Sequence, residues 1–115
     1  MDWTATFLAL AGARSPAPLD GENILGLLTH PAAPIRGRTL FWRKDHDGVV
    51  QKAARQGRWK YVRDGTTEHL FDLIADPGET DDVAHQHLDM VKKLRADVMR
   101  WETEVDRDPP LRRIL

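Results

Sequence analysis

Histidines and aspartates in the second half of the chain are residue types that can bind metal ions or transfer protons. The segment Lys44-Asp45-His46-Asp47-Gly48 places two aspartates beside a histidine, but it lacks the acidic ladder and the closing glutamate of a calcium loop. His85 and His87 lie two positions apart, and side chains at that spacing do not share one face of a helix. We therefore expect a polar loop at residues 44–48 and solvated histidines near the last helix, rather than metal sites.

Carboxylate pairs and tryptophans offer two further chemistries, acid–base catalysis and the stacking of sugars. The pairs Asp72 with Asp76 and Glu102 with Glu104 have no neighbouring sequence that supplies the apolar pocket or charge partner such catalysis needs, so we interpret them as solvated. The sequence has no cysteine, which excludes cysteine nucleophiles, thiolate metal sites and disulfides. Every tryptophan falls on an expected apolar face, so packing is the favoured interpretation for Trp3, Trp42, Trp59 and Trp101.

The length and composition are those of one globular domain with one core. The chain has 115 residues, of which 41% are hydrophobic and 30% charged. Its 17 basic and 18 acidic residues are mixed, without the basic cluster that nucleic acid would require. The apolar stretch at residues 7–13 is too short to span a bilayer, and Met1-Asp2 lacks the basic start of a signal peptide. We expect no nucleic-acid partner, no membrane partner and a cytoplasmic location.

The spacing of apolar residues predicts three helices. Asp2 is a suitable N-cap, and the apolar residues that follow predict an amphipathic helix over residues 2–12 that ends at Gly12. A short helix is predicted over residues 22–29, bounded by proline-containing segments. The clearest pattern is an apolar stripe that predicts a final helix of about five turns. Its members are Leu88, Val91, Leu94, Val98, Trp101 and Val105.

Alternating residues and turn signals predict four strands, over residues 39–43, 49–55, 58–63 and 69–74. We expect Gln56-Gly57 to close a tight hairpin, with the glycine at positive φ. Asp76-Pro77-Gly78-Glu79 fits a type II turn, with proline second and glycine third. The predicted fold is α+β, with a small antiparallel sheet of about four strands, a long C-terminal helix packed on one face and two short N-terminal helices.

The segment from residue 57 to residue 79 resembles the end of a sulfatase, where a "GxWKY" strand precedes "LYDLxxDPxE". The residues that carry this resemblance are Gly57, Trp59, Lys60, Tyr61, Leu70, Phe71, Asp72, Leu73, Asp76, Pro77 and Glu79. Further segments are similar to sulfatase motifs in the same order along the chain. They are residues 2–12 ("DLxPTLLxLAG"), 19–21 and 24–28 ("DGxSLxPLL"), 40–43 ("FW") and 82–84 ("NLA").

The resemblance, which covers roughly residues 2–105, implies three regions. Residues 1–37 correspond to the edge of the large domain of a full-length sulfatase. Residues 38–106 correspond to its small C-terminal α+β subdomain, and residues 107–115 form a tail. The resemblance also implies that the loop with Arg43, Lys44 and His46 borders the sulfate-ester pocket when the subdomain is docked on a catalytic domain.

The residues that the activity of the family requires are missing from this chain. The family makes its formylglycine nucleophile from the first residue of C/S-x-P-x-R, whereas the segment 15–19 lacks both the proline and the arginine at those offsets. A full-length relative also binds Ca²⁺ with an aspartate pair and a later Asp-Asn, but the only asparagine here, Asn23, follows Glu22. We therefore expect no cofactor in this chain, no catalytic residues and no activity from it alone.

Two functions follow as alternatives. The chain is either the non-catalytic C-terminal subdomain of a sulfatase-like sulfuric ester hydrolase or a stand-alone interaction module. Without a large domain, apolar surface should be exposed around Trp3, Phe7, Leu25 and Leu28, which we take as the association surface. The expected partner is a second copy of the chain, with a dimer favoured, or a missing sulfatase catalytic portion. An independent enzyme of another kind is the third and weakest interpretation.

Overall fold

The computed structural model describes residues 1–30, 32 and 37–107. Its chain divides into two compact units, residues 1–36 and residues 37–115, which we describe separately. The predicted tail therefore lies, except for Arg107, outside the described residues. Within the described part of the chain, no helix is long and apolar enough to cross a membrane.

The first unit is built around a hydroxyl that connects its two helices, α1 (Asp2–Leu10) and α2 (Leu25–Thr29). Thr6 is 1% exposed; its Oγ1 donates to the Asp2 carbonyl oxygen at 2.8 Å and accepts from the Ile24 N–H at 3.0 Å. The predicted helix end is confirmed, since Gly12 has φ of +64° just beyond α1. The second helix is shorter than predicted because the N–H of Glu22 bonds to the Asp2 carboxylate, outside a helical turn.

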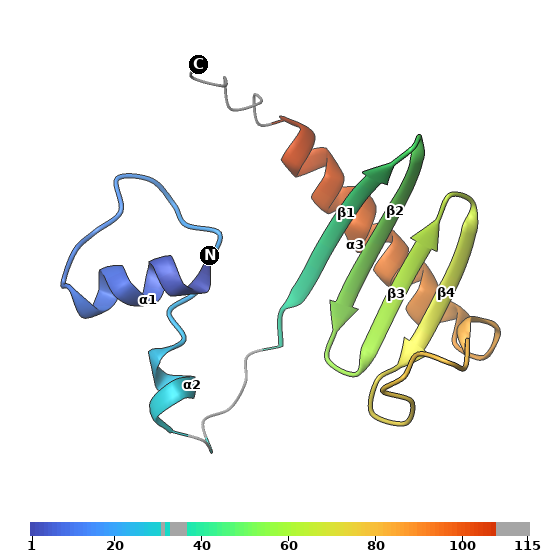
Figure 1. Cartoon of the computed structure of the whole chain (residues 1–115), viewed down its shortest axis with the longest axis horizontal. Helices are drawn as coiled ribbons and strands as arrows, with labels where there is room; N and C mark the ends of the chain where they lie inside the picture. Colours follow the sequence, from blue (N-terminus) through green and yellow to red (C-terminus); the bar gives the residue numbers. More distant parts are fainter. Residues whose placement is uncertain (31, 33–36, 108–115) are drawn as a thin grey trace. The chain divides into compact units, whose positions relative to one another are not determined.

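The second unit contains four antiparallel strands in the order β1-β2-β3-β4, with the long helix α3 (Leu88–Arg107) crossing one face of the sheet (Figure 1). The predicted α+β fold is confirmed. A short 3₁₀ helix, η1 (Ala84–Gln86), precedes α3. The strands are β1 (Thr39–His46), β2 (Val49–Gln56), β3 (Trp59–Asp64) and β4 (Thr67–Asp72).

Every hairpin in this sheet has a two-residue loop, and all three loops differ from the predictions. The β2–β3 loop is Gly57-Arg58, not Gln56-Gly57, because Gln56 pairs with Trp59 in the ladder. The glycine is still at positive φ, +57°. The predicted polar loop at residues 44–48 is also wrong. Both central residues of the turn Asp47-Gly48 have positive φ, which suits a type I′ hairpin, so β1 continues as far as His46.

The third hairpin explains why β4 begins earlier than predicted. Its loop is Gly65-Thr66, with the glycine at φ of +57°, so pairing resumes at Thr67 rather than at His69. The sheet then ends at Asp72, whose carboxylate accepts the N–H groups of Ile74 and Ala75. These bonds turn the chain away from the ladder.

The core lies between one row of the sheet and the apolar stripe of α3. The row crosses all four strands in register, from Phe41 through Ala54 and Tyr61 to Leu70, and the last three are fully buried. The helix contributes Val91, Leu94 and Val98, which are at most 4% exposed. Fully burying an aliphatic side chain of this size contributes about 1.5–3 kcal/mol. This packing fixes one face of the sheet against the helix and leaves the opposite face available for other contacts.

Candidate functional site

The structure places Arg43, the first predicted pocket residue, in an ion-pair network on the helix-covered face of the sheet. Its guanidinium donates to both carboxylate oxygens of Asp106, at 2.8 and 3.1 Å, and lies 3.5 Å from Glu102. The hydrogen bond from Arg43 holds the pKa of the Asp106 carboxyl below its usual range. Glu102 also accepts from Lys52 Nζ at 2.7 Å. Arg43 therefore fastens β1 to the end of α3 (Figure 1).

Lys44 and His46 follow Arg43 on the same strand, but alternation turns them toward the opposite face of the sheet. Lys44 is exposed. The His46 side chain is 75% exposed, and its Nε2 lies 3.4 Å from an Asp47 carboxylate oxygen. The structure thus does not bring the three predicted pocket residues together. Their role beside a sulfate-ester pocket stays a prediction.

The sequence predicted that both acidic pairs are solvated; Glu104 is exposed, but Asp72, Asp76 and Glu102 are partly buried. Asp72 accepts from Arg58 through both guanidinium Nε (2.8 Å) and a second nitrogen, and this hydrogen bond lowers the pKa of the Asp72 carboxyl. Asp76 accepts the backbone N–H groups of Thr80 and Asp81 at 2.6 and 2.8 Å. The carboxylates of Asp72, Asp76 and Glu102 therefore bond to the local backbone or connect two elements, which is a structural role.

The turn after β4 presents Glu79 to the sheet. Asp76-Pro77-Gly78-Glu79 is not a type II turn, because Gly78 is not at positive φ; Glu79 is, at +56°. The hydrogen bonds that Asp76 accepts from residues 80 and 81 tighten the turn and force Glu79 into this left-handed conformation. Its two carboxylate oxygens then accept from Lys60 Nζ at 2.7 and 2.6 Å. Lys60 lies on β3 and Glu79 on the turn, so this pair ties the turn to the sheet.

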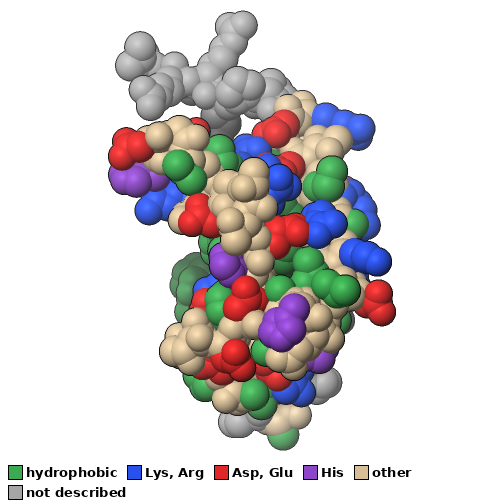
Figure 2. Space-filling view, turned by 90° about the vertical axis from the view of Figure 1, so that its right-hand side faces the viewer, with side chains coloured by type: hydrophobic (Ala, Val, Ile, Leu, Met, Phe, Trp, Pro, Cys, Tyr) green, Lys and Arg blue, Asp and Glu red, His purple; other side chains and the backbone are tan. Residues whose placement is uncertain are grey.

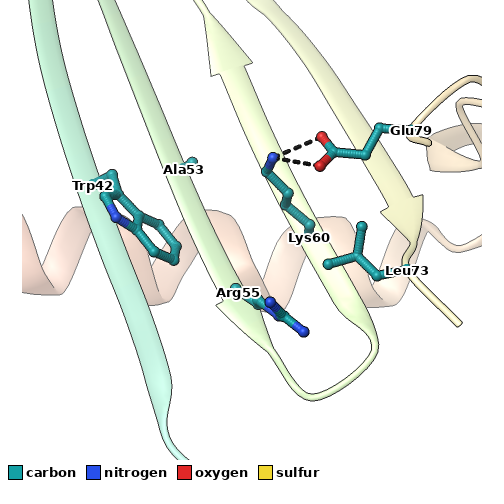
Figure 3. A pocket seen from close by; sticks show the side chains of 6 residues that line it. All are labelled: Trp42, Ala53, Arg55, Lys60, Leu73 and Glu79. Carbon is teal, nitrogen blue, oxygen red and sulfur yellow. Dashed lines mark hydrogen bonds and ion pairs between the residues drawn. The ribbon is translucent and has the colours of Figure 1, made fainter. Parts of the chain in front are cut away.

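A hollow of about 380 Å³ lies on the sheet face opposite α3, beside this ion pair. Figure 3 shows its side chains in front of the strands, with the helix behind them. The register places Trp42 of β1 beside Ala53 of β2, so a large side chain neighbours a very small one. The indole is 49% exposed. The lining residues are Trp42, Ala53, Arg55, Lys60, Leu73 and Glu79.

Trp42 corrects the expectation that every tryptophan is packing. Neighbours on a strand point to opposite faces, and in the segment Leu40-Phe41-Trp42-Arg43 it is Phe41 that stacks on Trp101 of the helix, with ring centroids 5.3 Å apart. Trp42 must then face the other way. The sequence held a signal for this orientation. Helix periodicity identifies Trp101 as facing the sheet, Phe41 is the strand residue that packs on it, and Trp42, as the next residue of the strand, must point to the opposite face.

The first unit exposes an aromatic pair on α1. Trp3 and Phe7 stack with ring centroids 5.7 Å apart, and their exposed fractions are 54% and 60%. Leu10, one turn further on, is 58% exposed. Of the α2 residues predicted for the association surface, Leu28 is 53% exposed and Leu25 is half-buried. Of the four residues predicted for the association surface, Trp3, Phe7 and Leu28 are therefore exposed and Leu25 is half-buried.

Asp82, which the sequence analysis considered only as part of the segment 82–84, makes several polar contacts. Although its partial burial opposes ionisation, the backbone N–H groups of Leu70 and Ala84 bond to one carboxylate oxygen at 3.0 and 2.9 Å and keep the pKa of Asp82 below its usual range. The other oxygen lies 2.8 Å from His69 Nδ1. The carboxylate therefore joins β4 to the start of η1. An Asx-type signal two residues before a helix start could have identified it.

Figure 2 shows both acidic and basic side chains on the surface that faces the viewer. In residues 1–30, 32 and 37–107 there is no group of three or more histidine and acidic side chains that could hold a metal ion.

Comparison with known proteins supplies a fold. No protein-family model and no curated protein matches the sequence. Among solved structures, the carrageenan sulfatase Ps i-CgsB, determined alone and with k-i-k-neocarrahexaose, is similar with a TM-score of 0.76 and 24% identity. That match covers 87% of this chain but 23% of the sulfatase.

A second solved sulfatase is BT33336S-sulf, from work on glycosaminoglycan metabolism by Bacteroides thetaiotaomicron, with a TM-score of 0.68 and 23% identity. It covers 89% of this chain and 24% of that protein. Both matches are larger than the second unit alone could supply, so they extend into the first unit. The chain spans about a quarter of the length of these sulfatases, and it has the fold of the sulfatase C-terminal region.

Proposed function

We propose that this chain is the C-terminal subdomain of a sulfatase-like sulfuric ester hydrolase and that it has no catalytic activity by itself. The main support for the proposal is the extent of the structural matches: nearly nine-tenths of this chain aligns with less than a quarter of each solved sulfatase. The sequence motifs of the sulfatase end occur in the same order over residues 2–105. The fold and the order of the motifs point to the same region of a sulfatase.

The chemistry of sulfate-ester cleavage has to come from elsewhere. A formylglycine needs a cysteine or serine in C/S-x-P-x-R, and this sequence has no such segment. Of the acidic side chains considered for catalysis, Asp72, Asp76 and Glu102 are ion-paired or bond to backbone groups, and Glu104 is exposed. We infer that formylglycine and Ca²⁺ belong to a catalytic portion on which this subdomain docks, and that the chain supplies surface and stability to that assembly.

The apolar stripe of α1 is the docking surface in this proposal. Trp3, Phe7 and Leu10 lie at i, i+4 and i+7 on one helix face and are each more than half exposed. The solved sulfatases contain about three-quarters of a chain beyond the matched part, which is the material that would cover such a stripe. An exposed aromatic patch of this kind marks an interaction site in a soluble protein.

The decisive experiment reads the gene upstream of Met1. A stretch encoding C/S-x-P-x-R, in frame or frameshifted, supports the subdomain proposal, and a promoter and ribosome site directly before Met1 contradict it. The purified chain should also show no turnover of an aryl sulfate. Turnover by the chain alone would contradict the non-catalytic part of the proposal.

Self-association is the competing function, and the exposed Trp3–Phe7 stack is the observation that favours it. In that case two copies pack their α1 stripes on each other as an isologous dimer. Sedimentation velocity at micromolar concentration separates the two. A dimer that Trp3→Glu converts to a monomer supports self-association, and a monomer before any substitution rejects it.

A further inference from the structure

We propose that strand β1, at one edge of the sheet, pairs with β1 of a second copy of the chain. The sheet has two edge strands, β1 and β4, which lie at its opposite sides (Figure 1). An edge strand carries a row of N–H and C=O groups that can bond to a further strand. The inference depends on the second unit alone and not on whether the chain docks on a catalytic portion.

The β4 edge is closed by the segment that follows it. Leu70 donates its N–H to the Asp82 carboxylate at 3.0 Å, and its carbonyl oxygen accepts from the Val83 N–H at 2.9 Å. The carbonyl oxygen of Asp72 accepts from the Asp76 N–H at 2.8 Å. A further strand could pair with β4 only by displacing these bonds.

The β1 edge is open. In a hairpin with a two-residue loop, the pair that flanks the loop is hydrogen-bonded, and bonded pairs then alternate with non-bonded ones. His46 and Val49 flank the loop, so even-numbered residues of β1 bond to β2 and odd-numbered residues point their N–H and C=O groups outward. The same rule correctly gives Leu70 and Asp72 as outward residues of β4. Within the described part of the chain, nothing bonds to the outward backbone groups of β1, which belong to Thr39, Phe41, Arg43 and Asp45.

The difference between the two edges selects the geometry of the pair. Among the described strands only β1 offers an open edge, so a second copy can contribute only its own β1. Two identical strands that pair antiparallel are related by a two-fold axis, and each uses up the open edge of the other. The assembly therefore closes at two chains and does not grow into a fibre.

The charged end of β1 selects the register. A two-fold axis at any of residues 43–45 would place a charged residue directly opposite its own copy, which is unfavourable. An axis at Trp42 would place Leu40 opposite Lys44 of the other copy. An axis at Phe41 avoids both arrangements, because it places Leu40 of each copy opposite Trp42 of the other. Residues 39–43 of the two copies then pair, and the charged residues beyond them lie outside the paired segment.

Leu40 and Trp42 supply the apolar contact in this register. Both point to the sheet face opposite α3, and they are 38% and 49% exposed. They would form non-hydrogen-bonded pairs, in which opposite side chains lie closest, and cross-strand contacts between large apolar side chains stabilise a sheet. The two-fold axis makes the contact twice, together with about six backbone hydrogen bonds from residues 39, 41 and 43. The β1 strand is therefore complementary to itself.

The test is backbone hydrogen exchange in the full chain, followed by proton–nitrogen correlation spectra from micromolar to near-millimolar concentration. The N–H groups of Phe41 and Arg43 should exchange at least about tenfold more slowly in the dimer. Those of Leu40 and Trp42 should change little, because they already bond to β2. Sedimentation equilibrium over the same series should show the dimer. A chain that stays monomeric, or a dimer in which the Phe41 and Arg43 N–H groups exchange rapidly, overturns the proposal.

Matched variants locate the interface. Trp42→Lys should weaken the dimer by about tenfold, because it removes both contacts between Leu40 and Trp42 at once. Ile74→Lys is the control: Ile74 is 71% exposed and lies just beyond β4, so the same change should leave the dimer intact. Trp3→Glu alters only the first unit, so a β1 dimer should persist in it, unlike a dimer formed through α1. Equal weakening by Trp42→Lys and Ile74→Lys, or loss of the dimer in Trp3→Glu, contradicts the pairing of β1.

Discussion

The core beneath α3 can be tested by one substitution whose cost follows from burial. Leu94 is fully buried among Ala54, Tyr61 and the helix residues Val91 and Val98. Leu94→Ala loses the transfer free energy of the missing carbons and leaves a cavity, which together cost roughly 2–5 kcal/mol. In a domain of this size each kcal/mol lowers the melting temperature by about 4–8 °C. We therefore expect the variant to melt roughly 8 °C or more below the parent chain.

Leu88→Ala is the matched control for this prediction. It changes the same residue type in the same helix, but Leu88 is 60% exposed, so less than half of its side chain leaves water on folding and the loss should be under about 1 kcal/mol. Circular dichroism melts of the two variants and the parent measure the difference. If the two variants lose the same stability, Leu94 does not lie in the core described above.

Three further predictions concern polar and backbone features of the second unit. The hydrogen bond from Arg95 lowers the pKa of Glu68. The contribution of this pair to the stability of the folded chain is therefore complete above the unfolded pKa of about 4.3 and is lost as the pH falls through the folded pKa. Glu68→Gln should accordingly flatten the dependence of the urea unfolding midpoint on acid pH. Gly57 has φ of +57° with open space around it, so Gly57→Val should cost about 1–2 kcal/mol in chemical denaturation and Gly57→Asn clearly less. The partly exposed Lys60–Glu79 pair should show a coupling below about 1 kcal/mol in a double-mutant cycle of Lys60→Met and Glu79→Gln; a larger coupling contradicts the partial solvation of the pair.

Local periodicity predicted most of the fold because each element of the second unit follows its own pattern. The middle of the α3 stripe is buried as predicted, at Val91, Leu94 and Val98, whereas its ends at Leu88 and Val105 are exposed. Alternation placed Trp59 and Tyr61 on one face, where Tyr61 is fully buried and Trp59 packs beside the core. Burial raises the pKa of Tyr61 to about 12, and its hydroxyl donates to Glu68 at 2.5 Å. The helix that covers this face was visible in the sequence as well.

The candidate site was harder to predict because its parts lie on four separate segments. The hollow combines Trp42 of β1, Arg55 of β2, Lys60 of β3 and Glu79 of the turn, and only the register brings them together. That register depends on where each hairpin turns. Placing one loop at Gln56-Gly57 instead of Gly57-Arg58 shifts every pairing between β2 and β3. Turn geometry was therefore the missing information.

Consecutive neighbours make up the entire sheet, and each loop between them is two residues long. Contacts between residues close in sequence form quickly, because little chain entropy is lost in closing such short loops. The sheet can therefore assemble progressively as it emerges from the ribosome, with no need for polypeptide made before residue 37. A gene broken upstream of the codon for residue 37 would therefore still encode a unit that folds, and such a unit can be retained in evolution as a separate protein.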